Sequence, residues 1–392
     1  MTFVPKFELC EPFDHSEYQG RIDRFQAELE RRGLDGMLLF AVESHIYLYN
    51  YDQISAWFFQ VLIVPRGKAP IAFVRHADQW LVQQSPFIKE VHTWRDVDED
   101  PIKRVAQIMT DHGLAGKRIG IETTSSYLDA HSYDILKKYL SDIGITLVEA
   151  SDIVGDMRLV KSPAEIEQMR KAGKVLDITA QAIFDAIKPG VRECDIYAEA
   201  LHAMYAAGGD QSAGPIPIAA GINTLSFCHY SPTRRVIQEG EAVTFEIGGC
   251  VNHYHAVGLY SACAGKATSE MKGLYEEVRR TVDAGRAVLG PGVPVSKVAE
   301  AMTATLGAEA QKDWGIHFGY GTGIGACLTW HDRLRISRTS KYTLQPGNTM
   351  TLFSGRMCQN KYHVMSGDPV LITENGFEDF GQLSRGPFQS LG

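Results

Sequence analysis

The segments AIFDAIKPGVRECDIYAEALHAMYAAGG (182–209) and AGRAVLGPGVPVSKVAEAMTATLGAE (284–309) decide the fold. Each begins as the end of a helix, passes through a Pro-Gly-Val turn and continues as a second helix. The turn glycines are Gly190 and Gly292, so the two copies are offset by 102 residues. A repeat at a fixed spacing indicates that one structural unit is used twice. We therefore expect two related halves in this part of the chain.

Strand patterns follow each helix pair. The first half continues with GPIPIAAGIN (214–223), AVTFEIGGCV (242–251) and HYHAVGLYSACAG (253–265). The second half continues with GIHFGYGTGIGACLTW (315–330), TMTLFSGRMC (349–358) and DPVLITENG (368–376). Apolar runs bounded by turn residues are typical of strands. The sequence thus predicts a pseudo-twofold α+β domain, with sheet inside and helices outside. A cleft between such halves is a natural ligand site.

The first 155 residues have a different pattern, because helical and strand-like segments alternate from the start. Residues 16–36 form an amphipathic helical pattern, and short apolar runs at 36–41, 60–67 and 71–76 are typical of strands. We therefore predict an α/β domain over 1–155 and the repeat domain over 156–392. The second domain opens with Ser162, Pro163 and Glu165, which are the signals of a capped helix.

Composition limits the classes of function. The 392 residues carry 39 basic and 47 acidic side chains, and no basic run of the kind that follows nucleic acid is present. No apolar run reaches membrane-spanning length, and the first residues lack an export signal. The seven cysteines are scattered without a CxxC pair. We expect a reduced, cytoplasmic protein that binds neither nucleic acid nor membrane.

Several motifs resemble those of one family. VKSPAEIEQMRKAGKV (160–175) is similar to that family's entry helix, and RRVIQEGEAVTFEIGG (234–249) is similar to the run before its first metal-binding aspartate. FGYGTGIG (318–325) and LQPGNTMTLFSG (344–355) resemble the segments that hold a metal-binding histidine and glutamate. The family is the pita-bread group of creatinase, prolidase, aminopeptidase P and methionine aminopeptidase. The resemblance covers nearly the whole chain, including the N-terminal domain of creatinase and prolidase.

The metal-ligand positions of that family are altered in this sequence. The resemblance places Glu246 and Val257 at the two aspartates, Thr322 at the histidine and Phe353 at the first glutamate. Ser366 or Gly367 falls at the last glutamate, depending on a one-residue alignment choice, with Asp368 beside them. A two-metal site needs several converging oxygen or imidazole donors. We therefore expect no metal and no other cofactor.

Two residues are the catalytic candidates. Glu246 lies inside a strand where a lone carboxylate in apolar surroundings favours the neutral form unless it meets a cation. The structural alternative for Glu246 is a buried ion pair with Arg333 or Arg356. His229 matches the position of the histidine that carries acid–base chemistry in creatinase, and its alternative is a structural histidine.

The substrate-binding candidates come from three places. On the strand at 253–265, alternation puts His253 and His255 on one face and Tyr254 on the other; we favour Tyr254 as a lining residue and keep His255 as a candidate. The segment CLTWHDRLR (327–335) and the strand after it add four more, of which an arginine would hold a substrate carboxylate: Trp330, His331, Arg333 and Arg356. Trp57 and Phe58 lie where creatinase reaches into its neighbour's site, which implies a homodimer; ordinary core packing is the alternative.

The branch that this pattern resembles most is ectoine hydrolase, followed by creatinase. Both are metal-free members that cleave a C–N bond in a small zwitterion with a delocalised cation. The resemblance implies opening of ectoine or 5-hydroxyectoine to N-acetyl-2,4-diaminobutyrate. Glu246 would attack the amidinium carbon or activate water, and His229 would protonate the departing nitrogen. The alternatives are a creatinase-type amidinohydrolase, a metal-dependent Xaa-Pro peptidase or sulfonium lyase, and a binding module without activity.

Overall fold

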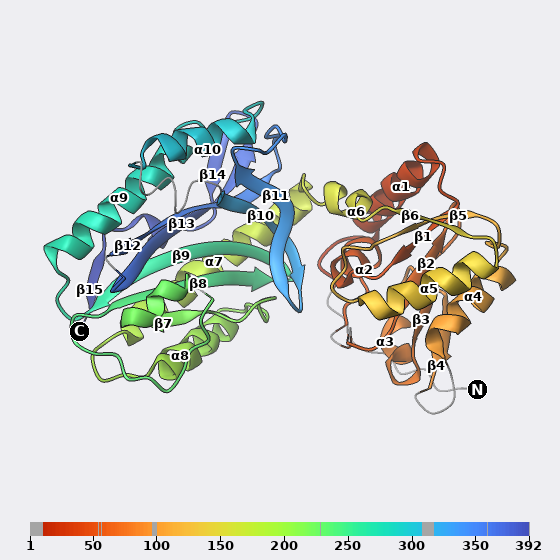
Figure 1. Cartoon of the computed structure of the whole chain (residues 1–392), viewed down its shortest axis with the longest axis horizontal. Helices are drawn as coiled ribbons and strands as arrows, with labels where there is room; N and C mark the ends of the chain where they lie inside the picture. The colour runs from red at the N-terminus through yellow and green to blue at the C-terminus, as the bar shows by residue number, and fades with distance from the viewer. Residues whose placement is uncertain are drawn as a thin grey trace. The chain divides into compact units, whose positions relative to one another are not determined.

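The computed structural model describes residues 11–53, 55, 57–95, 100–227, 229–307, 317–358 and 360–391. Residues 315 and 316, which the sequence assigns to a strand, lie outside these ranges. The chain divides into two compact units, Met1–Met157 and Arg158–Gly392 (Figure 1). Within the described residues, no helix combines the length and apolar character needed to cross a membrane.

The N-terminal unit is built on a six-stranded mixed sheet with the order β4-β3-β2-β1-β5-β6. β1 pairs antiparallel with β2 and parallel with β5, and β4 at one edge pairs parallel with β3. The strands are β1 (Gly36–Leu39), β2 (Val61–Pro65), β3 (Ile71–Arg75), β4 (Glu90–Trp94), β5 (Arg118–Ile121) and β6 (Thr146–Glu149). The helices are α1 (His15–Arg31), α2 (Val42–Tyr49), α3 (Gln79–Val82), α4 (Pro101–Asp111), α5 (Ala130–Asp142) and α6 (Asp152–Met157), with a 3-10 turn η1 (His76–Asp78).

The second unit is built on a nine-stranded sheet in which β11-β10-β12-β13-β9-β8-β7 form the main path. β14 pairs with β13, β15 pairs with β9, and β10 also pairs with β9. The strands are β7 (Ile218–Ala220), β8 (Ala242–Val251), β9 (Tyr254–Ala264), β10 (His317–Ala326), β11 (Thr329–Ser337), β12 (Thr349–Cys358), β13 (Tyr362–Thr373), β14 (Gly376–Asp379) and β15 (Gln389–Leu391). The helices are α7 (Pro163–Ala186), α8 (Glu193–Ala206), α9 (Ser269–Arg286) and α10 (Val295–Ala304), with 3-10 turns η2 (Gly221–Ser226) and η3 (Leu383–Arg385).

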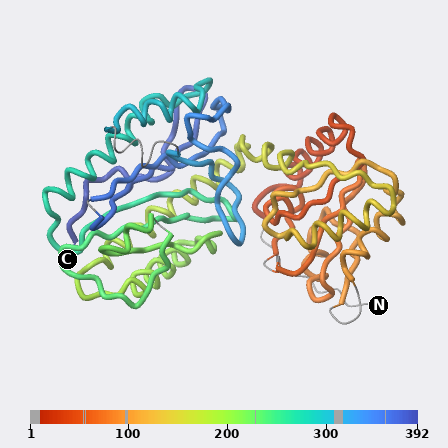
Figure 2. Tube along the Cα trace, viewed as in Figure 1, coloured from red at the N-terminus to blue at the C-terminus, as the bar shows by residue number. Residues whose placement is uncertain are grey.

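The repeat seen in the sequence appears as two helix pairs on one sheet. α7 packs on β8 and β9, whereas α9 packs on β12 and β13 (Figures 1 and 2). The turn glycines Gly190 and Gly292 have φ values of 90° and 81°, which explains why glycine stands at both positions. An α/β N-terminal domain followed by a pseudo-twofold α+β domain is therefore confirmed.

The first helix of the second unit begins as its sequence predicts. The Ser162 side chain accepts a hydrogen bond from the backbone N–H of Glu165, and the Glu165 carboxylate accepts one from the N–H of Ser162. This reciprocal cap satisfies two of the N–H groups that a helix start leaves unpaired. The helix ends at Ala186, four residues before the glycine at which the sequence pattern stops it.

Candidate active site

One face of the nine-stranded sheet carries the positions that the resemblance assigns to metal ligands. Residues directly opposite each other in an antiparallel pair present their side chains on the same face. Glu246 is opposite Leu259, Leu259 is opposite Gly367, and Gly367 is opposite Phe353. We call this the inner face, defined by Glu246, Leu259, Phe353 and Gly367. The other face packs against the helices, as when Phe245 contacts Phe184 of α7 with a ring-centroid distance of 5.2 Å.

At the last ligand position, residue 367 faces differently from its two neighbours. A Cβ added to Gly367 would lie 2.6 Å from Leu259 and 2.9 Å from Phe353, so position 367 points to the inner face. Ser366 and Asp368 point to the helix-covered face, where both accept hydrogen bonds from Arg279 of α9 at 2.9 and 2.8 Å. Asp368 is therefore not available as a ligand on the inner face.

The residues at the five ligand positions do not fit a two-metal centre. Val257, Phe353 and Gly367 offer no donor, which leaves the Glu246 carboxylate and the Thr322 hydroxyl. Val257 instead packs with Tyr320 and Trp330 in a small apolar cluster against which Phe353 lies. Divalent ions in hydrolytic sites need more oxygen or nitrogen ligands than this.

Glu246 is bonded to a tyrosine. The Tyr320 hydroxyl donates a hydrogen bond to the Glu246 carboxylate, and the Trp330 indole N–H lies 3.4 Å from the same hydroxyl oxygen. Burial raises the pKa of Glu246 to about 7, and the tyrosine hydrogen bond opposes part of that rise. The hydrogen-bond partner of Glu246 is thus a neutral side chain. The structural alternative, an ion pair of Glu246 with Arg333 or Arg356, is not found among the described residues.

Tyr320 organises the surrounding side chains. Its ring lies 3.9 Å from the His331 ring and 5.7 Å from the Phe353 ring, measured between centroids. We call Glu246, Tyr320, Trp330, His331 and Phe353 the Tyr320 cluster. Tyr320 is not among the residues predicted from the sequence, although it lies two residues before Thr322 and shares its face by strand alternation. The two-residue spacing between Tyr320 and Thr322 is the sequence feature that could have identified Tyr320.

His331 and Arg335 form the open side of the Tyr320 cluster. Alternation on β11 leaves His331, Arg333 and Arg335 exposed, whereas residues 330, 332, 334 and 336 between and beside them are buried. The imidazole of His331 packs on the Tyr320 ring, and this partial burial of the ring lowers the pKa of His331; the charge of Arg335 lowers it further. Arg335 is directly opposite Tyr320 in the β10–β11 pair, so its positive charge belongs to this site. Arg335 is not among the residues predicted from the sequence, in which Arg333 is the candidate arginine of this strand.

His229 lies on the loop after η2 and is exposed. Its backbone N–H donates to the Ser226 carbonyl at 3.1 Å. Phe227, two residues before His229, packs on His363 with a ring-centroid distance of 4.6 Å and holds the base of the loop against β13.

The preference for Tyr254 as a lining residue is wrong. Tyr254 is buried, and its hydroxyl donates to the Glu165 carboxylate at 2.9 Å, at the start of α7. His255 is on the opposite side of β9, the side of Glu246. Its Nε2 accepts from the Ala213 N–H at 3.0 Å, and its Nδ1 lies 3.4 Å from the Gly323 carbonyl oxygen. Burial lowers the pKa of His255 to about 4, so a neutral ring fixes the 213 loop beside the site.

Arg356 lies outside the candidate site. Arg356 lies on β12 next to Gly355, on the face that α9 covers, and pairs with Glu277 of that helix at 3.3 Å. Trp57 and Phe58 lie in the N-terminal unit, with Trp57 71% exposed and Phe58 under the Arg75 guanidinium at 4.1 Å. Their role toward a neighbouring subunit stays a prediction.

A buried ion group supports β11 from behind. Asp332 is 4% exposed and pairs with Lys161 at 2.5 Å and with Arg158 at 3.1 Å. Both cations lie at the start of the second unit, before α7. These ion pairs therefore connect the segment before α7 to β11, the strand that carries Trp330 and His331, and hold that strand in position.

Family models identify the class of this fold and site. Residues 167–374 match the model of Metallopeptidase family M24, and residues 21–160 match that of the Creatinase/Prolidase N-terminal domain. The first match spans more than half of the chain, so the chain belongs to the M24 family. The expected pita-bread relationship is confirmed.

Individual relatives include hydrolases with different substrates. The chain is 26% identical to the ectoine hydrolase of Halomonas elongata, over 95% of this chain and 97% of that protein. It is 25% identical to the probable dipeptidase PepE of Mycobacterium tuberculosis, over 93% and 94%. Among solved structures, the prolidase from Thermococcus sibiricus superposes with a TM-score of 0.85 at 21% identity, over 95% and 99%. The chain is thus a hydrolase of this family, and these nearly equal identities do not choose a substrate.

Proposed function

We propose that the protein opens the cyclic amidine ring of ectoine and 5-hydroxyectoine with water, without a metal ion. With ectoine the product would be N-acetyl-2,4-diaminobutyrate. The observation that carries the proposal is the replacement of the family's ligand set by a single carboxylate, Glu246, held by Tyr320 within an aromatic cluster. An amidinium carbon is already electron-poor, so it needs no Lewis acid for attack.

Glu246 has the properties that this reaction asks for. A carboxyl group whose pKa is about 7 exchanges a proton easily at neutral pH. The amidinium cation would favour the ionised form of Glu246, since an opposite charge nearby offsets the cost of burial. The carboxylate then either attacks the ring carbon or takes a proton from the attacking water. In both routes the water oxygen is gained overall, the ring C–N bond breaks and the departing nitrogen leaves as an amine.

The other roles follow from the surrounding side chains. His229, on its exposed loop after η2, would protonate the departing nitrogen. The aromatic side chains of the Tyr320 cluster, in which the Tyr320 and His331 rings pack on each other, would contact the delocalised cation bound at Glu246. We assign the substrate carboxylate to Arg335 instead of Arg356, because Arg335 is next to Tyr320 while Arg356 is on the other face.

The partner chain belongs to the same proposal. Trp57 is a large apolar side chain that is 71% exposed on the N-terminal unit. We propose a homodimer in which Trp57 and Phe58 close the partner's site. Light scattering on the eluted protein would give a dimer mass, and Trp57→Ala would raise KM for ectoine while leaving the fold unchanged.

A substrate panel tests the proposal. Chelator-treated protein is mixed in parallel with ectoine, creatine and a Xaa-Pro dipeptide, with and without added Mn²⁺, and products are followed by proton NMR. An N-acetyl signal from ectoine without metal supports the proposal. Turnover of creatine alone would assign an amidinohydrolase, and Mn²⁺-dependent dipeptide cleavage would assign a peptidase. A matched pair checks the site: Arg335→Ala should raise KM for ectoine at least tenfold, whereas Arg356→Ala should not.

A further inference from the structure

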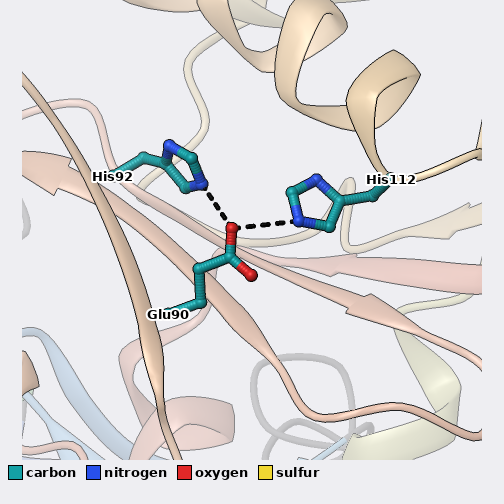
Figure 3. Close-up of side chains that lie close together, drawn as sticks. All are labelled: Glu90, His92 and His112. Atoms are coloured by element: carbon teal, nitrogen blue, oxygen red, sulfur yellow. Dashed lines mark hydrogen bonds and ion pairs between the residues drawn. The ribbon is translucent and has the colours of Figure 1, made fainter.

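Three metal-ligating side chains meet on the N-terminal unit, in a different unit from the Tyr320 cluster. The Glu90 Oε1 atom lies 2.7 Å from His92 Nε2 and 3.0 Å from His112 Nε2 (Figure 3). Within the described part of the chain, this is the one group of three or more His, Cys, Asp or Glu whose ligand atoms all lie within 4.8 Å of one another.

Local structure explains why these residues converge. Glu90 and His92 are two positions apart on β4, so strand alternation puts both on one face. β4 is an edge strand of the six-stranded sheet. His112 follows directly after α4 as its C-cap residue, and its ring lies 6.0 Å from the His92 ring at an interplanar angle of 90°. Two rings and one carboxylate thus approach a common point from two elements.

The hydrogen bonding of His112 places two acceptor atoms, its Nε2 and a carboxylate oxygen, against each other. Its Nδ1 lies 2.8 Å from the Ile108 carbonyl oxygen, which can only accept, so Nδ1 carries a hydrogen. In the neutral ring Nε2 then has a lone pair, yet it faces a carboxylate oxygen that also only accepts. A second proton on His112 or a metal ion between the two atoms resolves this. The Nδ1–H to carbonyl bond is the usual outer-shell support of a metal-binding histidine.

We propose that Glu90, His92 and His112 bind one Zn²⁺ ion. Two imidazoles and a carboxylate match the ligand preference of zinc, whereas Mg²⁺ and Ca²⁺ prefer oxygen donors alone. The three protein ligands leave a fourth tetrahedral position for water. The end of α4 also favours a cation, because the last carbonyl groups of a helix carry a partial negative charge.

The bound ion would fasten an edge strand to the helix that covers its sheet. An unpaired strand edge is a place where a sheet frays or pairs with another chain. Zinc would connect β4 to the end of α4 across this edge. Because the ligands belong to the N-terminal unit, zinc bound here would also appear in a metal analysis of the whole protein without taking part in the reaction proposed above.

Titration of the chelator-treated full chain with Zn²⁺, followed by calorimetry, tests this site. We expect one saturable site in the micromolar range or tighter, and at least a tenfold loss of affinity in His112→Gln and in Glu90→Gln. His131→Gln, an exposed histidine of α5, is the matched control and should bind zinc like the wild type.

Two further measurements distinguish a zinc site from a hydrogen-bond cluster without metal. Co²⁺ in place of zinc should give the visible absorption of a tetrahedral nitrogen–oxygen site, which His112→Gln should lose. Melting curves of the metal-free variants show whether they fold. If the wild type gives no saturable binding, or if folded His112→Gln binds zinc as tightly as the wild type, the three residues form only a protonated hydrogen-bond cluster and the proposal is wrong.

Discussion

Replacing Glu246 by glutamine should remove a loss of folding stability that the wild type shows as the pH rises. The folded chain raises the pKa of Glu246 from 4.5 to about 7, foremost through burial. The stability that its protonated form contributes is therefore complete below about pH 4.5 and is lost as the pH rises through about 7. Glutamine has nearly the same shape as the protonated carboxyl, can accept the Tyr320 hydrogen bond and does not titrate. The free energy of unfolding of the variant should therefore not fall in this way as the pH rises.

The size of the effect follows from the two pKa values. A rise from 4.5 to about 7, at about 1.4 kcal/mol for each pH unit, corresponds to about 3 kcal/mol. The Glu246 side chain keeps some accessible surface, and water that reaches the carboxylate reduces the expected value to about 2 kcal/mol. Glu246→Gln should thus differ from the wild type by less than about 1 kcal/mol at pH 5 and exceed it by about 2 to 3 kcal/mol above pH 8.

Urea unfolding of both proteins between pH 5 and 9 measures this difference, with the transition of the second unit followed by fluorescence. Glu374→Gln is the matched control, because it makes the same change at an exposed carboxyl between β13 and β14. A difference between Glu246→Gln and the wild type that stays constant over the whole range would refute the reasoning, since it would mean that Glu246 is ionised at the same pH in the folded and unfolded chain.

Three other variants test neighbouring parts of the structure. Tyr320→Phe removes a hydrogen bond that lowers the pKa of Glu246, so the acidic limb of the kcat/KM profile for ectoine should move to higher pH; an unmoved limb would separate Tyr320 from the reacting carboxylate. Tyr254→Phe removes the hydrogen bond to Glu165 and should cost about 1 to 2 kcal/mol of stability with kcat/KM unchanged, whereas a lining role would show in KM. Asp332→Asn leaves two cations without their partner and should cost about 3 kcal/mol in urea unfolding at pH 7; a loss below 1 kcal/mol would show that water reaches them.

Helix starts and repeated motifs could be predicted from the sequence because their causes are local. The Ser162 cap and the turn glycines Gly190 and Gly292 depend on residues within a few positions of one another. These features need no knowledge of how distant strands pair. The altered ligand positions come from the resemblance to the family's motifs, and the pairing of distant strands was needed to separate Ser366 from Gly367.

The wrong assignments all concern which face a side chain occupies. Alternation divides Tyr254 from His255, but it does not say which of them shares the face of Glu246; the β8–β9 register decides that. Arg356 is likewise assigned to the helix-covered face by the pairing of β12 with β13. Tyr320 was missed because its partner Glu246 is 74 residues away, on a strand brought near only by the folded sheet.

The central claim is that hydrolysis here depends on Glu246 and not on a metal. One measurement tests it most directly: the rate of ectoine turnover in chelator-treated wild type and Glu246→Gln, with the metal content of each sample measured in parallel. We predict that the wild type keeps its rate when metal is well below one ion per chain, and that Glu246→Gln loses at least a hundredfold in kcat. Loss of the wild-type rate on chelation, with recovery on adding Mn²⁺, would contradict the claim.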